Sequence, residues 1–202
     1  MKLYSNSFSP NARRPRICAA ELGIKLDVVE LDFKKGEMKA PAYLAKNPMG
    51  KVPTLEDDDG YLLWESPAML VYLANKHPDK GLAPADARGK AEVARWMFWN
   101  ASHLELAVMT VAFEKMVKPQ FMGQPTDEAR VAAGLADFER FAPVLDAQLA
   151  GKDWLCGKQF SIADICLGVT IDFAAMVGLD VAKHRNISSW IGRLRERASW
   201  KA

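Results

Sequence analysis

The chain of 202 residues has little cysteine and no long apolar run. Its three cysteines, Cys18, Cys156 and Cys166, are odd in number and include no Cys-x-x-Cys pair. This pattern indicates neither a disulfide framework nor a zinc site. The first residues pass directly into polar side chains, so no signal peptide is expected, and no apolar stretch has the length of a membrane span. We therefore expect a reduced, cytoplasmic protein with no bound metal.

A strong charge of one sign is also missing. The formal net charge is +2, with 26% charged residues, so no large field is directed toward nucleic acid or membrane. The cluster Arg13-Arg14-Pro15-Arg16 is too short for a nucleic-acid patch, and we interpret its side chains as solvated, although a small anionic ligand could use them. Half of the residues are hydrophobic, which is enough for one large core or two small ones.

Residues 1–77 alternate strand and helix patterns. The expected strands are residues 2–4, 27–31, 54–56 and 61–63, and the expected helices are residues 16–22, 41–46 and 66–75. Gly23 is placed to end the first helix, and Asp59-Gly60 is typical of a hairpin turn. The order predicts a small mixed α/β sheet with helices against it.

Strand patterns are missing after the linker at residues 77–84, so we predict an all-helical second domain over residues 86–202. One helical pattern runs from residue 87 to Lys118 and ends at Pro119, and a second runs from about Thr126 to Ala150. Ser161 and Asp164 have the spacing of a capping box, so we interpret Asp164 as structural rather than catalytic. A last helix is expected over residues 188–197.

The most informative segment is Gly50-Lys51-Val52-Pro53 together with Glu65-Ser66-Pro67. A proline at the entry to a strand leaves the backbone N–H and C=O of Val52 without a partner in their own sheet. These groups can pair with an extended peptide. Ser66 and Pro67 open a helix whose N–H groups attract a carboxylate, and Glu65 beside them can take an ammonium. A γ-glutamyl tripeptide such as glutathione has all three features.

In these motifs the chain resembles the cytosolic glutathione transferases along nearly its whole length. The resemblance rests on the first-half pattern, the turn at residues 47–53, the pair Glu65-Ser66 and the helix start at residues 160–164. Ser9-Pro10-Asn11 follows the first strand where the serine-type phi and theta-like classes and their bacterial relatives keep a catalytic serine. The resemblance implies a thioredoxin-like α/β N-terminal domain followed by an all-α C-terminal domain.

The resemblance also implies the site. Val52 pairs with the cysteinyl backbone of glutathione, and the Val52–Pro53 bond is cis. The other glutathione-binding residues are Glu65 and Ser66 for the γ-glutamyl end, Lys39 and Lys51 for the glycyl carboxylate, and Asn11. Glutathione is a co-substrate, no further cofactor is expected, and the chain is expected to form a homodimer that takes part in detoxification.

Ser9 is the expected thiolate donor. A hydroxyl that donates to the sulfur would stabilise the thiolate without acting as a nucleophile. Ser9 could instead only cap the following helix. Because Pro15 would clash deep inside that helix, we expect the helix to begin between Asn11 and Arg14, with Asn11 as its cap and the Ser9 hydroxyl free. Ser7 stays a rival, and Ser5 and Tyr4 are weaker ones.

The expected electrophile pocket contains Phe8, Pro10, Met109 and Phe113, since Met and Phe recur at helical spacing in the second half. The predicted function is conjugation of the glutathione thiolate to a hydrophobic electrophile. Two alternatives stay open. One is a non-catalytic binding or dimerisation module like that in the gamma subunit of elongation factor 1, and the other is a glutathione-dependent peroxidase or isomerase.

Overall fold

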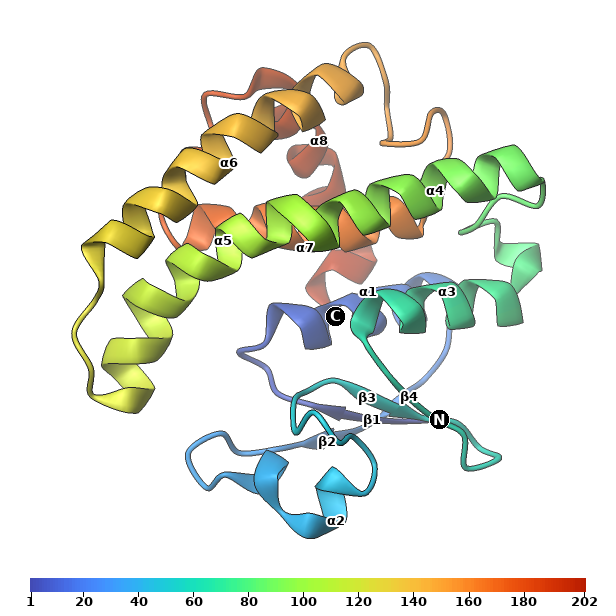
Figure 1. Ribbon diagram of the computed structural model, residues 1–202. Helices are drawn as coiled ribbons and strands as arrows, with labels where there is room; N and C mark the ends of the chain where they lie inside the picture. The colour runs from blue at the N-terminus through green and yellow to red at the C-terminus, as the bar shows by residue number, and fades with distance from the viewer. The chain divides into compact units, whose positions relative to one another are not determined.

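The computed structural model describes all 202 residues and separates into two compact units. Unit 1 consists of Met1–Ala83 together with Ala198–Ala202, and unit 2 consists of Pro84–Arg197. The labels of the helices and strands are those of Figure 1. No helix combines the length and the apolar character that a membrane span requires.

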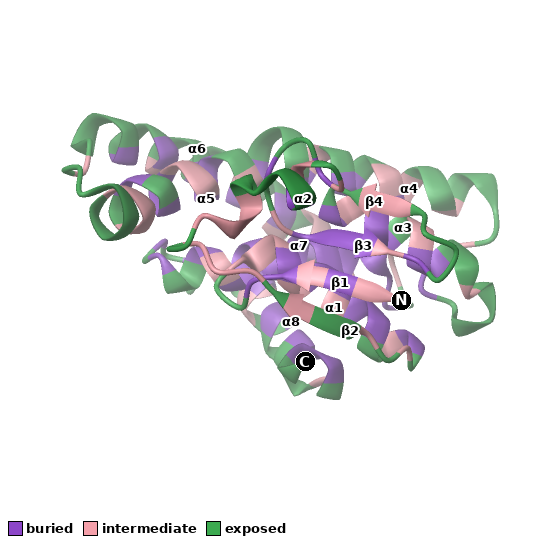
Figure 2. Cartoon of the chain, turned by 90° about the horizontal axis from the view of Figure 1, so that it is seen from below, coloured by how far each residue is buried: buried purple, intermediate pink, exposed green.

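The sheet of unit 1 has four strands in the order β2-β1-β3-β4. They are β1 (Lys2–Ser5), β2 (Asp27–Glu30), β3 (Thr54–Glu56) and β4 (Leu62–Trp64). β1 is parallel to β2 and antiparallel to β3, and β3 and β4 form the hairpin. The predicted mixed sheet is confirmed. The central strands β1 and β3 contain its buried residues, whereas the edge strand β2 is largely exposed (Figure 2).

Three helices cover this sheet. They are α1 (Pro10–Leu22), α2 (Pro41–Leu44) and α3 (Ser66–Lys76), and they are accompanied by the 3₁₀ turns η1 (Glu37–Lys39) and η2 (Pro78–Lys80). α1 and α3 lie side by side on one face, and α2 lies on the other (Figure 1). Fully buried side chains fill the space between the sheet and the two helices α1 and α3: Leu3, Ile17, Leu55, Met69, Leu70 and Leu73.

The first helix begins earlier than the sequence predicted. We expected a start between Asn11 and Arg14, but α1 begins at Pro10 with Ser9 as its N-cap. Proline is favourable at the first helical position because its missing N–H has no helical partner there. Pro15 lies inside α1 and removes one backbone bond, and the burial of Pro15 and Ile17 against the core offsets that loss.

The last five residues also differ from the prediction, which placed them in the second domain. They form the short 3₁₀ helix η5 (Ala198–Lys201) and belong to unit 1. The cause lies on α1. The Arg13 guanidinium donates to the carbonyl of Trp200 at 2.9 Å and lies 5.1 Å over its ring. The Ser199 hydroxyl also donates to Glu21 of the same helix.

Unit 2 is all helical, as predicted. Its elements are α4 (Ala87–Trp99), η3 (Asn100–Leu104), α5 (Glu105–Ala112), η4 (Phe113–Met122), α6 (Glu128–Leu149), α7 (Ile162–Met176) and α8 (Arg185–Glu196). Helix α7 is buried along most of its length, and α4, α5 and α8 pack against it. It begins with the predicted capping box, in which the Ser161 N–H donates to Asp164 at 2.9 Å.

Asp164 is a structural residue, because several groups of unit 2 donate to its buried carboxyl. The Leu155 N–H and the Trp190 indole N–H reach one oxygen at 2.8 and 2.9 Å, and the Ser161 hydroxyl reaches the other at 3.0 Å. Burial raises the pKa of Asp164, and these donors oppose that rise. The carboxyl thus ties the start of α7 to α8 and to the preceding loop.

Pro119 does not end the first helical segment of unit 2, contrary to the prediction. The segment continues as the π-helical η4 through Met122 and ends at Gly123, which has a φ of 61°. In a π-helix the backbone bonds span five residues. The wider turn does not force the proline ring against the carbonyl four residues earlier, so the chain stays helical.

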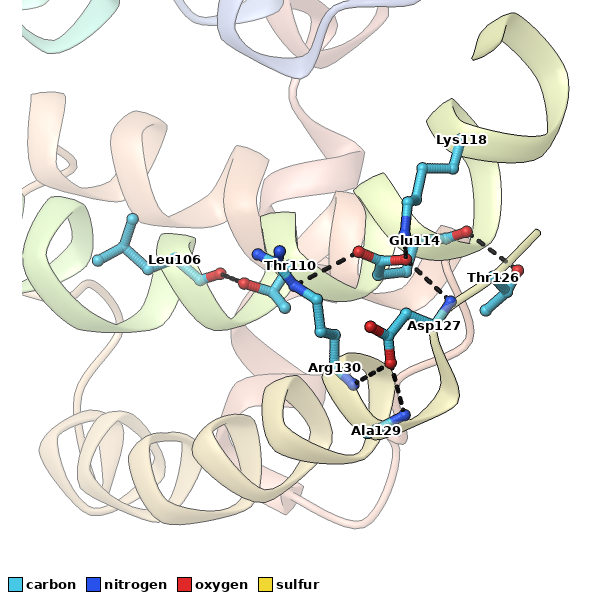
Figure 3. A network of polar contacts seen from close by, with 8 residues as sticks. All are labelled: Leu106, Thr110, Glu114, Lys118, Thr126, Asp127, Ala129 and Arg130. Atoms are coloured by element: carbon cyan, nitrogen blue, oxygen red, sulfur yellow. Dashed lines mark hydrogen bonds and ion pairs between the residues drawn. The ribbon is translucent and has the colours of Figure 1, made fainter. Parts of the chain in front are cut away.

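A buried carboxylate joins η4 to α6 (Figure 3). Glu114 accepts from Lys118 Nζ at 2.7 Å and from the Asp127 N–H at 3.0 Å, and its carbonyl accepts from the Thr126 hydroxyl at 3.1 Å. Arg130 Nε lies 3.4 Å from its other oxygen. The hydrogen bond from Lys118 lowers the pKa of Glu114. Asp127 is the N-cap of α6, which begins at Glu128, close to the start expected at about Thr126.

Candidate functional site

Three segments with predicted site residues leave the sheet of unit 1 at the same end. Thr54 pairs with Tyr4 of β1 on one side and with Trp64 of β4 on the other. Beyond these pairs, β1 leads into residues 6–9 and then α1, β3 is preceded by Val52-Pro53, and β4 leads into Glu65-Ser66 at the start of α3. The antiparallel register therefore brings the three segments together.

The Val52 backbone is available to a ligand. The Val52–Pro53 bond is cis, as the resemblance implied. No hydrogen bond of the protein involves the N–H or C=O of Val52, which is only half-buried. The preceding carbonyl of Lys51, by contrast, accepts from the Tyr43 hydroxyl at 2.6 Å and from Asn47 Nδ2 at 2.8 Å. One peptide unit is thus held in place while the next keeps its hydrogen-bonding groups for an extended peptide.

Hydrogen bonds among polar side chains hold the turn at residues 47–53 in place. Asn47 also donates to Thr54 Oγ1 at 3.2 Å and accepts from the Met49 N–H at 3.0 Å, and the Tyr43 and Thr54 hydroxyls lie 2.8 Å apart. Burial raises the pKa of Tyr43, and hydrogen bonds with Thr54 and Asn47 oppose the rise. Tyr43 and Thr54 were not predicted from the sequence, because their only signal is a polar residue on each side of the Asn-Pro turn.

Gly50 allows the turn to approach Lys39. Its φ is 58°, and a Cβ there would lie 2.8 Å from Lys39 Nζ and 2.9 Å from the Met38 carbonyl. Lys39 Nζ lies 3.5 Å from the Met49 carbonyl. Lys39 and Lys51 are both exposed, so two ammonium groups border the turn and face solvent.

The backbone at the start of α3 has an unusual conformation. Glu65, its N-cap, is the only non-glycine residue with a positive φ, at 71°. Such a conformation is costly for a residue with a Cβ and is often found at functional sites. The Glu65 side chain is exposed, whereas Ser66 is buried at the first turn of the helix. A carboxylate and a helix N-terminus therefore stand side by side, as the sequence predicted.

Arg14 corrects the interpretation of the arginine cluster. We expected a solvated side chain, but Arg14 is 2% exposed. Its Nη1 donates to Asn11 Oδ1 at 2.6 Å and to Ser66 Oγ at 3.1 Å. The sequence contained a signal for this, because Arg14 lies three and four positions before the buried Ile17 and Cys18 and so shares their helix face.

Ser9 caps α1, so the prediction that its hydroxyl is free of the helix is wrong. Its Oγ accepts from the Ala12 N–H at 3.3 Å. The rivals differ from it: the Tyr4 hydroxyl donates to Glu56 at 2.8 Å, the Ser5 hydroxyl is fully buried without a partner, and Ser7 is exposed. Accepting a bond occupies an oxygen lone pair and leaves the hydroxyl proton. Ser9 can therefore cap the helix and still donate.

Comparisons with known proteins agree with this geometry. Residues 1–75 match the family model of the glutathione S-transferase N-terminal domain, and residues 105–198 match that of the C-terminal domain. A probable glutathione S-transferase, GSTF2 of Oryza sativa subsp. japonica, is 34% identical over 98% of this chain and 93% of its own length. The chain belongs to the glutathione S-transferase family. The glutathione S-transferase theta-1 of Rattus norvegicus is 33% identical over 82% of this chain and 69% of its own length.

Solved structures of the family have the same fold. A glutathione transferase homologue from Sulfitobacter, solved with bound glutathione, has a TM-score of 0.84 and 26% identity, and the match covers 99% of this chain and 94% of that one. The two-domain architecture implied by the resemblance, with a thioredoxin-like first half, is thereby confirmed.

Two of the three thiols of this transferase, those of Cys18 and Cys156, have a raised pKa. Burial, with a smaller effect of the negative Glu21, raises the pKa of Cys18 to about 12. Burial and the nearby Asp164 raise the pKa of Cys156 to about 12 as well. A thiolate needs the opposite environment, since its pKa falls beside cations or hydrogen-bond donors. The surroundings of Cys18 and Cys156 therefore disfavour a thiolate.

The residues expected to line the electrophile pocket fall in both units. Phe8 is 80% exposed, and Pro10 opens α1 in unit 1. Met109 of α5 is half-buried, and Phe113 at the start of η4 is 37% exposed, both in unit 2. Each offers apolar surface within its own unit, and their common role as a pocket stays a prediction.

Proposed function

We propose that this chain binds glutathione on unit 1 and activates its thiol as a thiolate, which attacks an electrophilic carbon of a hydrophobic co-substrate and forms a C–S bond. The observation that supports this best is the pair of hydroxyls of Ser9 and Ser66. Each oxygen already accepts a fixed donor, so each proton remains for an anion. Both stand at the end of the sheet where Val52 has free backbone groups.

The proposed pose uses the three segments in order. The cysteinyl backbone pairs with Val52 and thereby directs the thiol toward Ser9. The γ-glutamyl ammonium meets Glu65, and its carboxylate meets Ser66 and the N-terminus of α3. The glycyl carboxylate lies between Lys39 and Lys51. Asn11 accepts from Arg14 with its oxygen, so its amide N–H groups are the ones that face the ligand.

The available interactions are strong enough for this chemistry. A free thiol has a pKa of ~8.5, so only a few per cent is ionised at neutral pH. Lowering that value by about two units requires about 2.7 kcal/mol of preferential thiolate stabilisation. A hydroxyl that donates to a charged group supplies about 1.5–3 kcal/mol. The N-terminus of α1 adds about 0.3–1 kcal/mol. One hydroxyl and one helix end are therefore sufficient, and no general base is needed.

The alternative of a non-catalytic module has no observation in its favour, because the relatives that the comparisons found are transferases. We also propose that the chain acts as a homodimer.

A conjugation assay against a panel of hydrophobic electrophiles, with hydroperoxides in parallel, separates the enzymatic possibilities. Turnover of hydroperoxides alone would support the peroxidase, and glutathione binding without turnover would support the binding module.

The binding site is tested by calorimetry with glutathione. Glu65→Ala and Ser66→Ala should each raise the dissociation constant about tenfold, because each removes a charge-assisted bond of about 1.5 kcal/mol. Ser7→Ala is the control, since Ser7 is exposed near the site and has no proposed contact. Affinities equal to wild type in both variants would place glutathione elsewhere.

A further inference from the structure

A buried guanidinium lies behind the start of α3. Arg14 comes from α1, is 2% exposed, and reaches across to Ser66, which is 3% exposed. The Nη1–Oγ distance is 3.1 Å, and the same Nη1 lies 2.6 Å from Asn11 Oδ1. One side chain therefore connects the first turns of the two helices that face the proposed γ-glutamyl site.

This contact has only one possible direction. A guanidinium has hydrogen-bond donors and no acceptor, so in the bond between Arg14 and Ser66 the serine oxygen must be the acceptor. The lone pair used for Arg14 then orients the hydroxyl, and its proton must point to another group. No acceptor within the protein takes that proton. Ser66 thus keeps its proton for a group outside the protein, and the positive guanidinium behind it favours an anion over a cation there.

We propose that Arg14 is a positioning residue that makes the γ-glutamyl end of the site selective for a carboxylate. It occupies one lone pair of the Ser66 hydroxyl, so that the proton points away from the guanidinium, and it places a positive charge behind the hydroxyl, where burial weakens screening by water. This inference rests on the proposed function, because it names the group of glutathione that Ser66 and the α3 N-terminus meet. Arg14 touches neither the ligand nor the thiol in this arrangement.

Arg16 offers a matched comparison on the same helix. It lies two positions further along α1, keeps 32% of its side chain exposed, and forms an ion pair with Glu30 at 3.8 Å. It therefore carries the same charge close by, without a contact to Ser66. A variant at Arg16 changes the net charge and the helix composition as a variant at Arg14 does, but leaves the Ser66 hydroxyl untouched.

The test measures affinity for two ligands by calorimetry: glutathione, and its analogue γ-aminobutyryl-cysteinyl-glycine, which lacks only the α-carboxylate of the γ-glutamyl residue. In wild type the ratio of the two dissociation constants reports how much the carboxylate contributes. Arg14→Gln should weaken glutathione binding about 10- to 100-fold and leave analogue binding nearly unchanged, so the ratio collapses. Arg16→Gln should keep the wild-type ratio. In turnover, Arg14→Gln should raise KM for glutathione while kcat at saturation stays near wild type.

The possible outcomes distinguish a failure of the proposed function from a failure of the role proposed for Arg14. If wild type binds no glutathione, the proposed function fails. If wild type binds it and Arg14→Gln weakens both ligands equally, Arg14 is merely structural and the inference is overturned. Should Arg14→Gln fail to fold by circular dichroism, Arg14→Lys is measured in its place. Lysine keeps the charge but not the rigid fork, so we expect a ratio reduced by about threefold or more, and a wild-type ratio would overturn the inference.

Discussion

Replacing Ser9 separates its two roles, because the structure gives its oxygen a partner in α1 and the proposed function uses its proton for the thiolate. The oxygen caps α1 through a long contact of 3.3 Å to Ala12. Ser9→Ala removes both the cap and the donor, whereas Ser9→Gly removes the donor and keeps most of the capping, which glycine replaces at a cost of only a few tenths of a kcal/mol. The two variants should therefore lose the same activity but different amounts of stability.

The expected magnitude follows from the thiolate population. A donor of about 1.5–3 kcal/mol is equivalent to one or two pKa units of the bound thiol. If the bound pKa moves from ~6.5 back to ~8.5, the thiolate fraction at pH 7 falls from about three quarters to about 3%. We therefore expect kcat for conjugation to fall about 10- to 100-fold in both variants. Glutathione affinity should change much less, because the ends of the tripeptide are held elsewhere.

The assay is the ultraviolet absorbance of bound thiolate, titrated against pH, together with kcat and the thermal unfolding midpoint. Ser7→Ala is the control and should leave all three nearly unchanged. If Ser9→Ala and Ser9→Gly both titrate and turn over like wild type, the hydroxyl is only a cap. Loss of the low thiol pKa in Ser7→Ala instead would reassign the donor to Ser7 while preserving the class of mechanism.

Three further predictions concern stability and assembly. The hydrogen bonds from Lys76 and Tyr72 outweigh the effect of burial and hold the pKa of Asp57 at about 2, below its unfolded value of about 3.9. The stabilisation that the Asp57 carboxylate gives to the folded state is therefore present above pH ~4 and is lost as the pH falls toward ~2. Asp57→Asn should thus be less stable than wild type at neutral pH, with the gap closing in acid unfolding curves; a constant gap would contradict this. Glu114→Gln should lower the thermal midpoint more than Glu139→Gln, whose ion pair with Lys183 is exposed; equal shifts would refute the joining role of Glu114. Sedimentation at micromolar concentration should give a dimer, and a 22.4 kDa species alone would exclude it.

The sequence predicted the parts of the fold that depend on local chemistry. The Asp59-Gly60 hairpin and the Ser161 capping box both formed, because turn and cap preferences act over a few residues. The effect of proline on helix boundaries was predicted less accurately. Pro15 and Pro119 were both expected to limit helices, yet both lie inside helical segments, since packing in α1 and π-helical geometry in η4 accommodate them.

The site was predictable where its chemistry lies in the backbone and missed where it depends on tertiary contacts. The exposed backbone of Val52 follows from Pro53 alone, and the helix start at which we propose a bound carboxylate follows from Ser66-Pro67. The burial of Arg14 has a local signal, but nothing local indicates Ser66 as its partner, because that contact joins residues 52 positions apart. A charge run is usually a solvated face, and only the helix face shared with buried neighbours distinguishes this arginine from Arg16.

Capping and catalysis are compatible roles for a serine at this position. A hydroxyl without a fixed partner rotates and can face an anion or a cation equally well, so it must reorganise when charge appears. A donor from the protein that occupies one lone pair of the oxygen restricts that freedom: the Ala12 N–H does so for Ser9, and the guanidinium of Arg14 does so for Ser66. Both protons then have fewer directions open to them before the ligand arrives, and preorganised donors are the ones that stabilise a developing or bound anion most. The helix start that accounts for Ser9 structurally is therefore compatible with the thiolate contact that we propose for it.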